Sequence, residues 1–317
     1  MIRKFIRFFK RCIRYVISDF PNFIQSKYIL QQWHKDPSTI YFVCPYGIGD
    51  TLFIASLIKA YKRYYSIEKV VLVVKKSQSD LPDFFRSVDG KIVSDSIVHT
   101  LTKYSKNRQR FLEDNYRYGH FILNHDWPEP GQLLGIGGLN LIDIYKRCVL
   151  KIPLDANMEL LHTTVGTLKM KEYQKKYGSN EKVVLLMPYA ITLTRLPIEF
   201  WEKIAYQLKQ KSYMVYTNVK DTSELPIKGT KDICLSLKDL FIISRTFHWI
   251  CIALRSGICD LLGYSDVPLI TIHNDAETKK AWNMNGLRLP NKNMIDIFLE
   301  PEKNIDENIV NILAKVG

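Results

Sequence analysis

The amino-acid sequence lacks the long apolar run that a membrane-spanning helix requires. None of its apolar stretches approaches ~20 residues, the length that crosses a bilayer, because charged residues interrupt them. Charge also interrupts the N-terminal segment, so we expect no signal peptide. Low-complexity tracts and short repeats are missing as well. We therefore expect a globular chain, and 317 residues favour two domains of about 150 residues each.

Sequence patterns for metal, redox and common nucleotide chemistry are also absent. The six cysteines are scattered, and none forms a Cys-x-x-Cys pair. Cys44 and Cys251 lie inside apolar runs, which is typical of reduced, buried thiols in a cytoplasmic protein. The sequence has no His-Glu-x-x-His, Walker A, kinase or Gly-x-Ser-x-Gly pattern. We therefore expect neither a catalytic metal nor a bound cofactor.

Positive charge, in contrast, is in excess. The chain contains 45 Lys and Arg against 32 Asp and Glu, a formal net charge of +13, which favours an acidic partner. Residues 1–36 hold eight Lys/Arg and two Asp, so their net charge is +6. Nearly half of the excess charge therefore lies in a small N-terminal part of the chain.

Residues 1–17 combine this charge with apolar residues at helical spacing. The apolar positions are Ile2, Phe5, Ile6, Phe9, Ile13, Val16 and Ile17. Basic residues fill most of the positions between them, a pattern that favours a helix lying on an anionic membrane surface. A solvated helix docked on the protein body is the alternative, and nucleic acid is a weaker option because no recognised binding module is present. We expect segment 1–37 to lie on the cytoplasmic membrane face, with residues 19–38 as a mixed linker.

Beyond residue 38, short apolar strands alternate with helical patterns, which predicts an α/β fold with parallel sheets. The predicted strands are residues 40–44, 69–74, 119–124, 182–187, 213–217, 231–235, 249–254 and 267–272. The predicted helices are residues 50–62, 80–87, 104–116, 138–150, 197–210, 237–246, 256–263 and 306–316. We expect an N-terminal domain at 38–165, a C-terminal domain at 180–290 and a tail with a closing helix at 291–317.

The stretch 39–62 reads as a strand, a glycine turn and a helix. Gly47 and Gly49 let the backbone turn sharply and let a partner approach closely. No third glycine follows, so the dinucleotide-binding fingerprint is incomplete. Asp50 occupies the helix start, where a phosphate would otherwise dock. The pattern therefore favours an acid or base at the mouth of a cleft.

Two later loops carry residues that suit phosphate. Thr194 and Arg195 come just before a predicted helix, although a capped helix with an exposed arginine explains them equally well. Ser256 follows a buried strand as a helix cap, and Gly257 permits close approach. The preceding residue, Arg255, adds a fixed positive charge. The loop suits a diphosphate, and the alternative is an arginine paired with Asp260.

Another loop suits contact with a sugar. The acid–base groups and the indole of this loop belong to His125, Asp126, Trp127 and Glu129. An ordinary turn built on two prolines explains the same loop slightly better.

The loop after the last predicted strand suits a nucleoside. His273 and Asn274 can contact a ribose or base there, and Asp260 is a further candidate. A capped following helix explains this loop equally well.

Three segments in this order resemble the heptosyltransferase group, glycosyltransferase family 9. They are Gly-Ile-Gly-Asp-Thr-Leu at 47–52, Pro-Tyr-Ala…Arg-Leu-Pro…Trp at 188–201, and Leu-Arg-Ser-Gly-Ile…Val-Pro-Leu-Ile at 254–270. The resemblance covers about residues 40–285. It implies two Rossmann-like domains facing across a cleft in the GT-B arrangement. It also implies metal-independent transfer of a sugar from a nucleotide donor, with inversion.

The resemblance also implies roles for individual residues. Asp50 matches the general base on the acceptor hydroxyl, and Arg195 matches the basic residue at the donor phosphates. Ser256 and Gly257 match the loop under the diphosphate. The chain departs from the family at Arg255, where an Asp is usual, and at residue 260, where a His is usual. A related bacterial polysaccharide glycosyltransferase therefore fits as well as a heptosyltransferase.

We thus expect an inverting glycosyltransferase of cell-surface polysaccharide or lipopolysaccharide synthesis. Its partners would be a nucleotide-sugar donor, a glycan or lipid-linked acceptor and, through residues 1–17, an anionic membrane surface, with no nucleic acid. A GT-B-like nucleotide-sugar epimerase, a pyruvyl transferase and a non-catalytic membrane-bound partner of another transferase are the alternatives.

Overall fold

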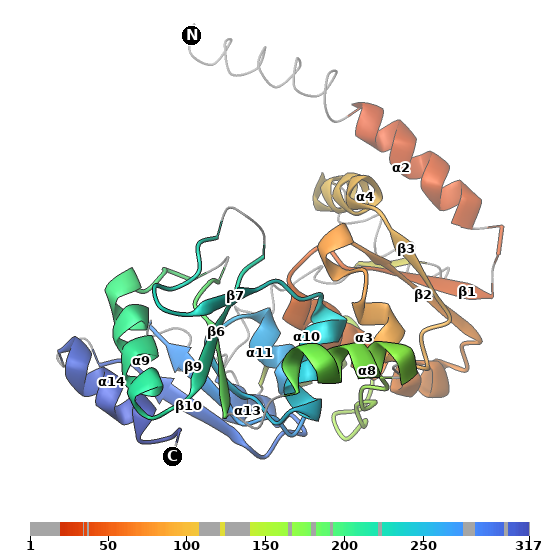
Figure 1. Ribbon diagram of the computed structural model, residues 1–317. Coiled ribbons are helices and arrows are strands. Elements are labelled where there is room, and N and C mark those ends of the chain that lie inside the picture. Colours follow the sequence, from red (N-terminus) through yellow and green to blue (C-terminus); the bar gives the residue numbers. More distant parts are fainter. Residues whose placement is uncertain are drawn as a thin grey trace, which may run out of the picture. The chain divides into compact units, whose positions relative to one another are not determined.

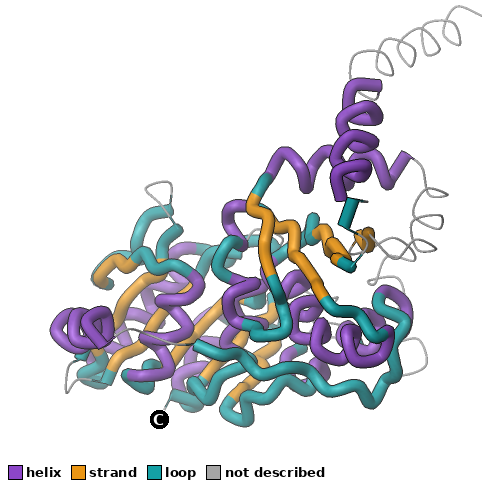
Figure 2. Tube along the Cα trace, turned by 90° about the vertical axis from the view of Figure 1, so that its right-hand side faces the viewer, coloured by secondary structure: helices purple, strands orange, loops and turns teal. Residues whose placement is uncertain are grey.

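The structure is a computed structural model, in which the chain forms two compact units (Figure 1). It describes residues 20–33, 35–36, 38–107, 121–123, 140–163, 167–178, 182–190, 193–220, 224–274, 283–300 and 304–316. The first unit comprises Met1–Tyr46, Ile54–Pro130 and Tyr145–Glu159, and the second comprises Gly47–Phe53, Gly131–Ile144 and Leu160–Gly317. Figure 2 shows strands flanked by helices in each unit.

A four-stranded parallel sheet forms the centre of the first unit, in the order β3-β2-β1-β4. Its strands are β1 (Thr39–Val43), β2 (Lys69–Val74), β3 (Gly90–Val93) and β4 (Phe121–Leu123). β1 and β2 are rich in β-branched residues and mostly buried, as expected for strands that helices cover on both faces. Parallel pairing confirms the predicted α/β class for this unit.

Two helices of the first unit, α2 and α4, differ from the predicted ones. The predicted linker 19–38 contains a helix, α2, which packs against α4. A helix was predicted at residues 104–116, and the observed helix in this region, α4, starts at Asp95. Residues 108–120 lie outside the described residues. The helical segments are α2 (Phe20–Trp33), most of α3 (Ile48–Tyr65), η2 (Lys76–Gln78), η3 (Leu81–Phe84), α4 (Asp95–Asn107) and η5 (Tyr145–Val149).

A six-stranded parallel sheet forms the centre of the second unit, in the order β10-β9-β8-β5-β6-β7. Its strands are β5 (Val183–Met187), β6 (Met214–Asn218), β7 (Lys231–Ile233), β8 (Ile250–Leu254), β9 (Leu269–His273) and β10 (Met294–Phe298). All of these strands except β10 overlap predicted ones. β10 lies in the predicted tail, where it pairs with β9 at the edge of the sheet.

Helices cover the second sheet and bury its largest side chains. α9 and α14 pack together, and Trp201 of α9 is 1% exposed in a core that includes Ile252 and Ile309. α8 lies between the domains predicted at 38–165 and 180–290. The helices are α7 (Leu141–Ile144), α8 (Thr167–Tyr177), α9 (Ile198–Gln210), α10 (Leu237–Thr246), α11 (Gly257–Leu262), α13 (Met284–Leu287) and α14 (Ile305–Leu313).

Two further findings concern the described residues only. None of their helices combines the length and the apolar character needed to cross a membrane. Cys44 and Cys251 are buried, as predicted from the apolar runs around them.

Candidate active site

The first turn of α3 holds an acidic side chain that bonds back to the turn before the helix. The backbone N–H of Gly47 donates a hydrogen bond to Asp50 Oδ2 at 3.0 Å. Asp50 lies in the first turn of α3, where unpaired N–H groups and the helix dipole favour a carboxylate. The residue is half-buried. The same bond is one half of a capping box, so Asp50 also stabilises the helix end.

Two glycines allow the start of α3 to lie against the start of α11 within the second unit. A Cβ atom on Gly257 would lie 2.8 Å from Ile48 Cβ and 2.9 Å from the Gly49 nitrogen. A Cβ atom on Gly49 would overlap the Asp260 carboxylate, with Cγ 2.9 Å away. These glycines therefore serve close packing of the two helix starts. Ser256 precedes α11 in extended backbone and makes no side-chain cap bond.

A buried ion pair lies beneath Gly49. Arg255 Nη2 donates to Asp260 Oδ1 at 2.7 Å and Nη1 donates to Oδ2 at 3.1 Å, while Nη1 also donates to the Ser256 carbonyl at 2.7 Å. Both residues are 4% exposed. Burial raises the pKa of Asp260 to about 6, against the opposing charge of Arg255, and the Asp50 carboxylate adds to the increase. This pairing is the alternative that the sequence left open for Arg255.

Thr194 and Arg195 lie elsewhere in the second unit, and Arg195 lines a pocket of about 290 Å³. Arg195 is exposed, and its guanidinium carbon lies 5.2 Å from the centre of the Tyr189 ring. The Asn274 side-chain amide donates to the Thr194 carbonyl, so the structure brings these two predicted residues together. The pocket is lined by Pro188, Tyr189, Arg195, Leu196, Ile198, Trp201, Glu224 and Leu225.

The His273 side chain is fully buried and bound to a residue that the sequence analysis missed. Its Nε2 lies 2.7 Å from Asp296 Oδ1, and Asp296 also accepts hydrogen bonds from the backbone N–H groups of Met284 and Asn285. Burial raises the pKa of Asp296, but the hydrogen bonds from His273 and the two N–H groups outweigh it and leave this pKa below its usual value. The contact ties β9, β10 and α13 together. An acidic residue inside an apolar strand, Met-Ile-Asp-Ile-Phe, was the available signal.

The remaining predicted residues cannot be placed. His125, Asp126, Trp127 and Glu129 lie outside the described residues. Within the described part of the chain, no three His, Cys, Asp or Glu side chains gather as ligands of a metal ion.

Comparison with known proteins rests on structure, because no family model and no curated protein sequence matches the chain. E. coli ADP-heptose LPS heptosyltransferase II is similar with a TM-score of 0.59 and 12% identity, over 88% of this chain and 98% of that one. A glycosyl transferase family 9 protein of Veillonella parvula has a TM-score of 0.57 and 11% identity, over 86% and 90%. E. coli heptosyltransferase WaaC, solved with ADP, has a TM-score of 0.53 and 11% identity, over 87% and 99%.

These similarities show the fold. The chain has two α/β units with parallel sheets, the fold of GT-B glycosyltransferases of the heptosyltransferase type. The predicted α/β class with two Rossmann-like domains is therefore confirmed. The predicted N-terminal helix precedes the described residues.

Proposed function

We propose that this protein is a glycosyltransferase that moves a sugar from a nucleotide-sugar donor to a hydroxyl group of a glycan or lipid-linked acceptor in cell-surface polysaccharide synthesis. The similarity to heptosyltransferase II over nearly the whole of both chains carries this proposal. Heptosyltransferase WaaC, which shares the fold, has been solved with ADP and with ADP-2-deoxy-2-fluoro heptose. A nucleotide sugar is therefore the donor class to test first.

In the proposed reaction, the acceptor hydroxyl oxygen attacks the anomeric carbon of the donor sugar. The bond from that carbon to the diphosphate oxygen breaks, and its electron pair stays with the diphosphate. Asp50 takes the proton of the hydroxyl group as general base, and the anomeric configuration inverts. The bond from the Gly47 N–H supports this role, since it fixes the orientation of the carboxylate.

The developing charge on the diphosphate needs a cation, and Arg195 is the one we assign. Its side chain is exposed beside a pocket and follows the carboxyl end of β5, where ligands of parallel sheets bind. Arg255 is held by Asp260 through two hydrogen bonds, so we do not assign it to the diphosphate. The proposal also includes inversion at the anomeric carbon and a glycan or lipid-linked acceptor. It further includes contact of Thr194, Ser256 and Gly257 with the donor phosphates.

The experiment combines a donor screen with substitution of the proposed base. Thermal shift with UDP, GDP, ADP, CMP and their sugars identifies the donor, because a ligand at 100 times its dissociation constant adds about 2.7 kcal/mol of stability. Asp50→Asn should then lower turnover by about 10²–10⁴-fold and leave nucleotide binding near the parent value. Parent-level turnover in this variant would exclude Asp50 as the base.

Asp143 offers a matched control for the structural role of Asp50. Its Oδ2 accepts the Asn140 N–H at 3.4 Å, the same capping contact at the start of α7. Asp143→Asn should therefore reproduce any cost of a weakened helix cap without the loss of turnover. Product analysis with donor alone separates transfer from epimerisation, since an epimerase alters the donor without an acceptor.

A further inference from the structure

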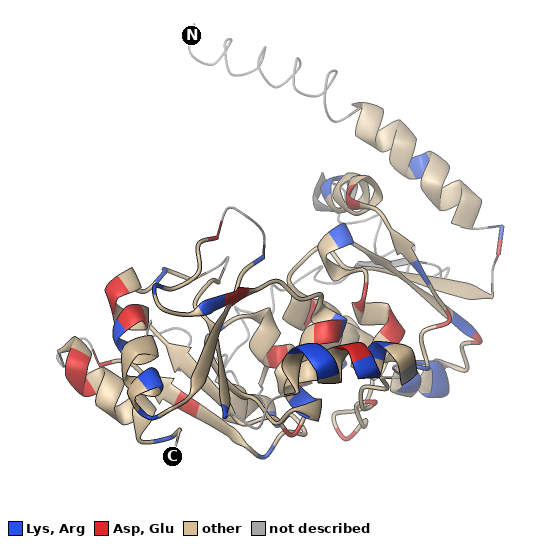
Figure 3. Cartoon of the chain, viewed as in Figure 1, with Lys and Arg blue, Asp and Glu red and all other residues tan. Residues whose placement is uncertain are grey.

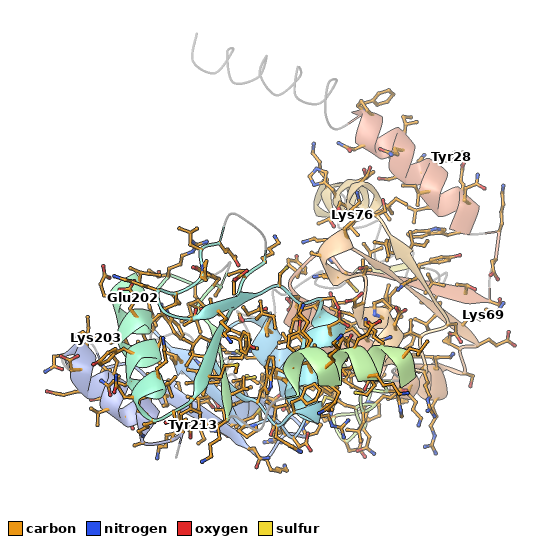
Figure 4. The ribbon with its side chains drawn as sticks, in the orientation of Figure 1. Tyr28, Lys69, Lys76, Glu202, Lys203 and Tyr213 are labelled. Atoms are coloured by element: carbon orange, nitrogen blue, oxygen red, sulfur yellow. The ribbon has the colours of Figure 1, made fainter. Side chains whose placement is uncertain are left out.

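Helix α2 carries a stripe of large, exposed apolar side chains. Phe20, Ile24 and Tyr28 are 48%, 52% and 62% exposed. They are spaced four residues apart, so they lie on one face of the helix. Figure 4 labels Tyr28 on α2. We call these three residues the outer stripe.

The other side of α2 is already packed within the first unit. Leu30 and Trp33 are buried with Val98 and Leu101 of α4, and the Trp33 ring stacks on Tyr41 with ring centres 4.3 Å apart. The unit thus fixes the orientation of α2 and directs the outer stripe away from its own core. A helix that is apolar on two sides needs a second apolar environment.

The charge of the surrounding sequence indicates which environment that is. Lys27 is the single charged residue of α2, and the helix contains no acidic residue (Figure 3). Residues 1–36 carry a net charge of +6. In the sequence, a basic segment adjoins the phenylalanine, isoleucine and tyrosine of the outer stripe. This combination matches the interface of an anionic bilayer, where aromatic rings lie at the headgroup level.

The outer stripe also continues a spacing that begins earlier in the sequence. Apolar residues recur every three or four positions up to Ile17, and Phe20, Ile24 and Tyr28 keep the same period. Residues 1–17, for which the sequence predicts membrane contact, lie outside the described residues. The outer stripe extends that pattern onto a helix that is anchored in the fold.

We propose that the outer stripe of α2 inserts into the interface of an anionic lipid bilayer and holds the first unit on the membrane surface. Because α2 is packed against α4, membrane contact would fix the first unit and not only a leading segment. This proposal does not depend on the glycosyl transfer proposed above.

The test is co-sedimentation of the full chain with phosphatidylcholine vesicles, with and without phosphatidylserine. The parent should bind the anionic vesicles. The variant Phe20→Ser/Ile24→Ser/Tyr28→Ser should bind them about tenfold more weakly, because it lacks the three apolar side chains that move from water into the bilayer interface. Absence of parent binding, or equal binding by the variant, would overturn the proposal. Circular dichroism checks that the variant retains its fold.

A matched control removes apolar surface elsewhere. Leu168, Tyr206 and Val310 are 79%, 65% and 61% exposed on helices of the second unit. Changing all three to serine should leave vesicle binding unchanged. An equal loss of binding in this control would show that general surface apolarity, and not α2, is responsible.

A local probe separates α2 from residues 1–17. Tyr28→Trp should show emission quenched by brominated anionic lipid, whereas Tyr206→Trp should show no quenching beyond that of the parent. An unquenched Trp at position 28 would place the outer stripe in water and overturn the proposal. Sedimentation velocity without lipid tests the alternative that the outer stripe binds a second copy of this chain. If the serine variant loses self-association but keeps lipid binding, the outer stripe is an interface between two copies.

Discussion

Gly49→Ala tests the close packing of α3 against α11. The substitution removes a glycine from a helix, which by propensity alone would stabilise the protein by up to about 1 kcal/mol. The new Cβ would instead overlap the Asp260 carboxylate, whose Cγ would be 2.9 Å away. Asp260 is 4% exposed and its carboxylate is held by two hydrogen bonds from Arg255, so it cannot swing into solvent. Packing and propensity therefore predict opposite signs.

The expected loss of stability follows from the displacement of the Asp260 carboxylate. Overpacking a core typically costs about 1–3 kcal/mol, and breaking a buried ion pair costs about 3–5 kcal/mol. After the propensity gain is subtracted, Gly49→Ala should lower the free energy of unfolding by about 1–4 kcal/mol. Urea denaturation followed by circular dichroism measures this loss as a lower transition midpoint.

Two further variants make the measurement specific. Gly47→Ala, in the same turn, places its Cβ 3.3 Å from Asp50 Oδ2 and should cost no more than about 1 kcal/mol. In an Arg255→Met/Asp260→Ala background the overlap is gone, so Gly49→Ala should become neutral or stabilising. A neutral or stabilising effect of Gly49→Ala in the parent protein would refute the packing argument.

The remaining predictions concern acid stability and the proposed donor site. The pKa of Asp296 is lowered in the folded protein, so its contribution is present above the unfolded value of about 3.9 and is lost as pH falls through the folded value. Asp296→Asn should therefore flatten the stability profile below about pH 4, measured as urea midpoints against pH; an unchanged slope would contradict it. Arg195→Ala should weaken binding of the donor's nucleoside diphosphate about tenfold or more in calorimetry. Lys203→Ala, which breaks a surface pair with Asp306, should leave that affinity unchanged, and equal affinities in all three proteins would remove Arg195 from the site.

The strands that the sequence predicted are those whose own residues carry the signal. β2 and β5 are runs of valine and leucine, and their apolar character follows from burial between helices. β3 was missed because it is a short edge strand in which exposed and half-buried residues alternate. β10 was missed because an acidic residue interrupts it. That residue, Asp296, is bound by His273 of β9, a contact that a local pattern cannot contain.

The candidate site could likewise be predicted only where a local pattern carries the signal. Asp50 could be singled out because a carboxylate at a glycine turn and helix start is a local pattern. The residues next to Arg255 in the sequence do not decide whether its partner is a phosphate or Asp260. It depends on burial, and part of that burial comes from the first turn of α3, distant in sequence, which lies directly over Asp260.

This arrangement has a consequence for the donor. An arginine that gives two hydrogen bonds to a buried carboxylate and a third to a carbonyl is already occupied. Drawing it to a diphosphate would leave Asp260 buried without its countercharge, which is costly. The exposed guanidinium of Arg195 carries no such cost, since water already solvates it. If a nucleoside diphosphate binds, its affinity should therefore depend on Arg195, and loss of the Arg255–Asp260 pair should act through stability first.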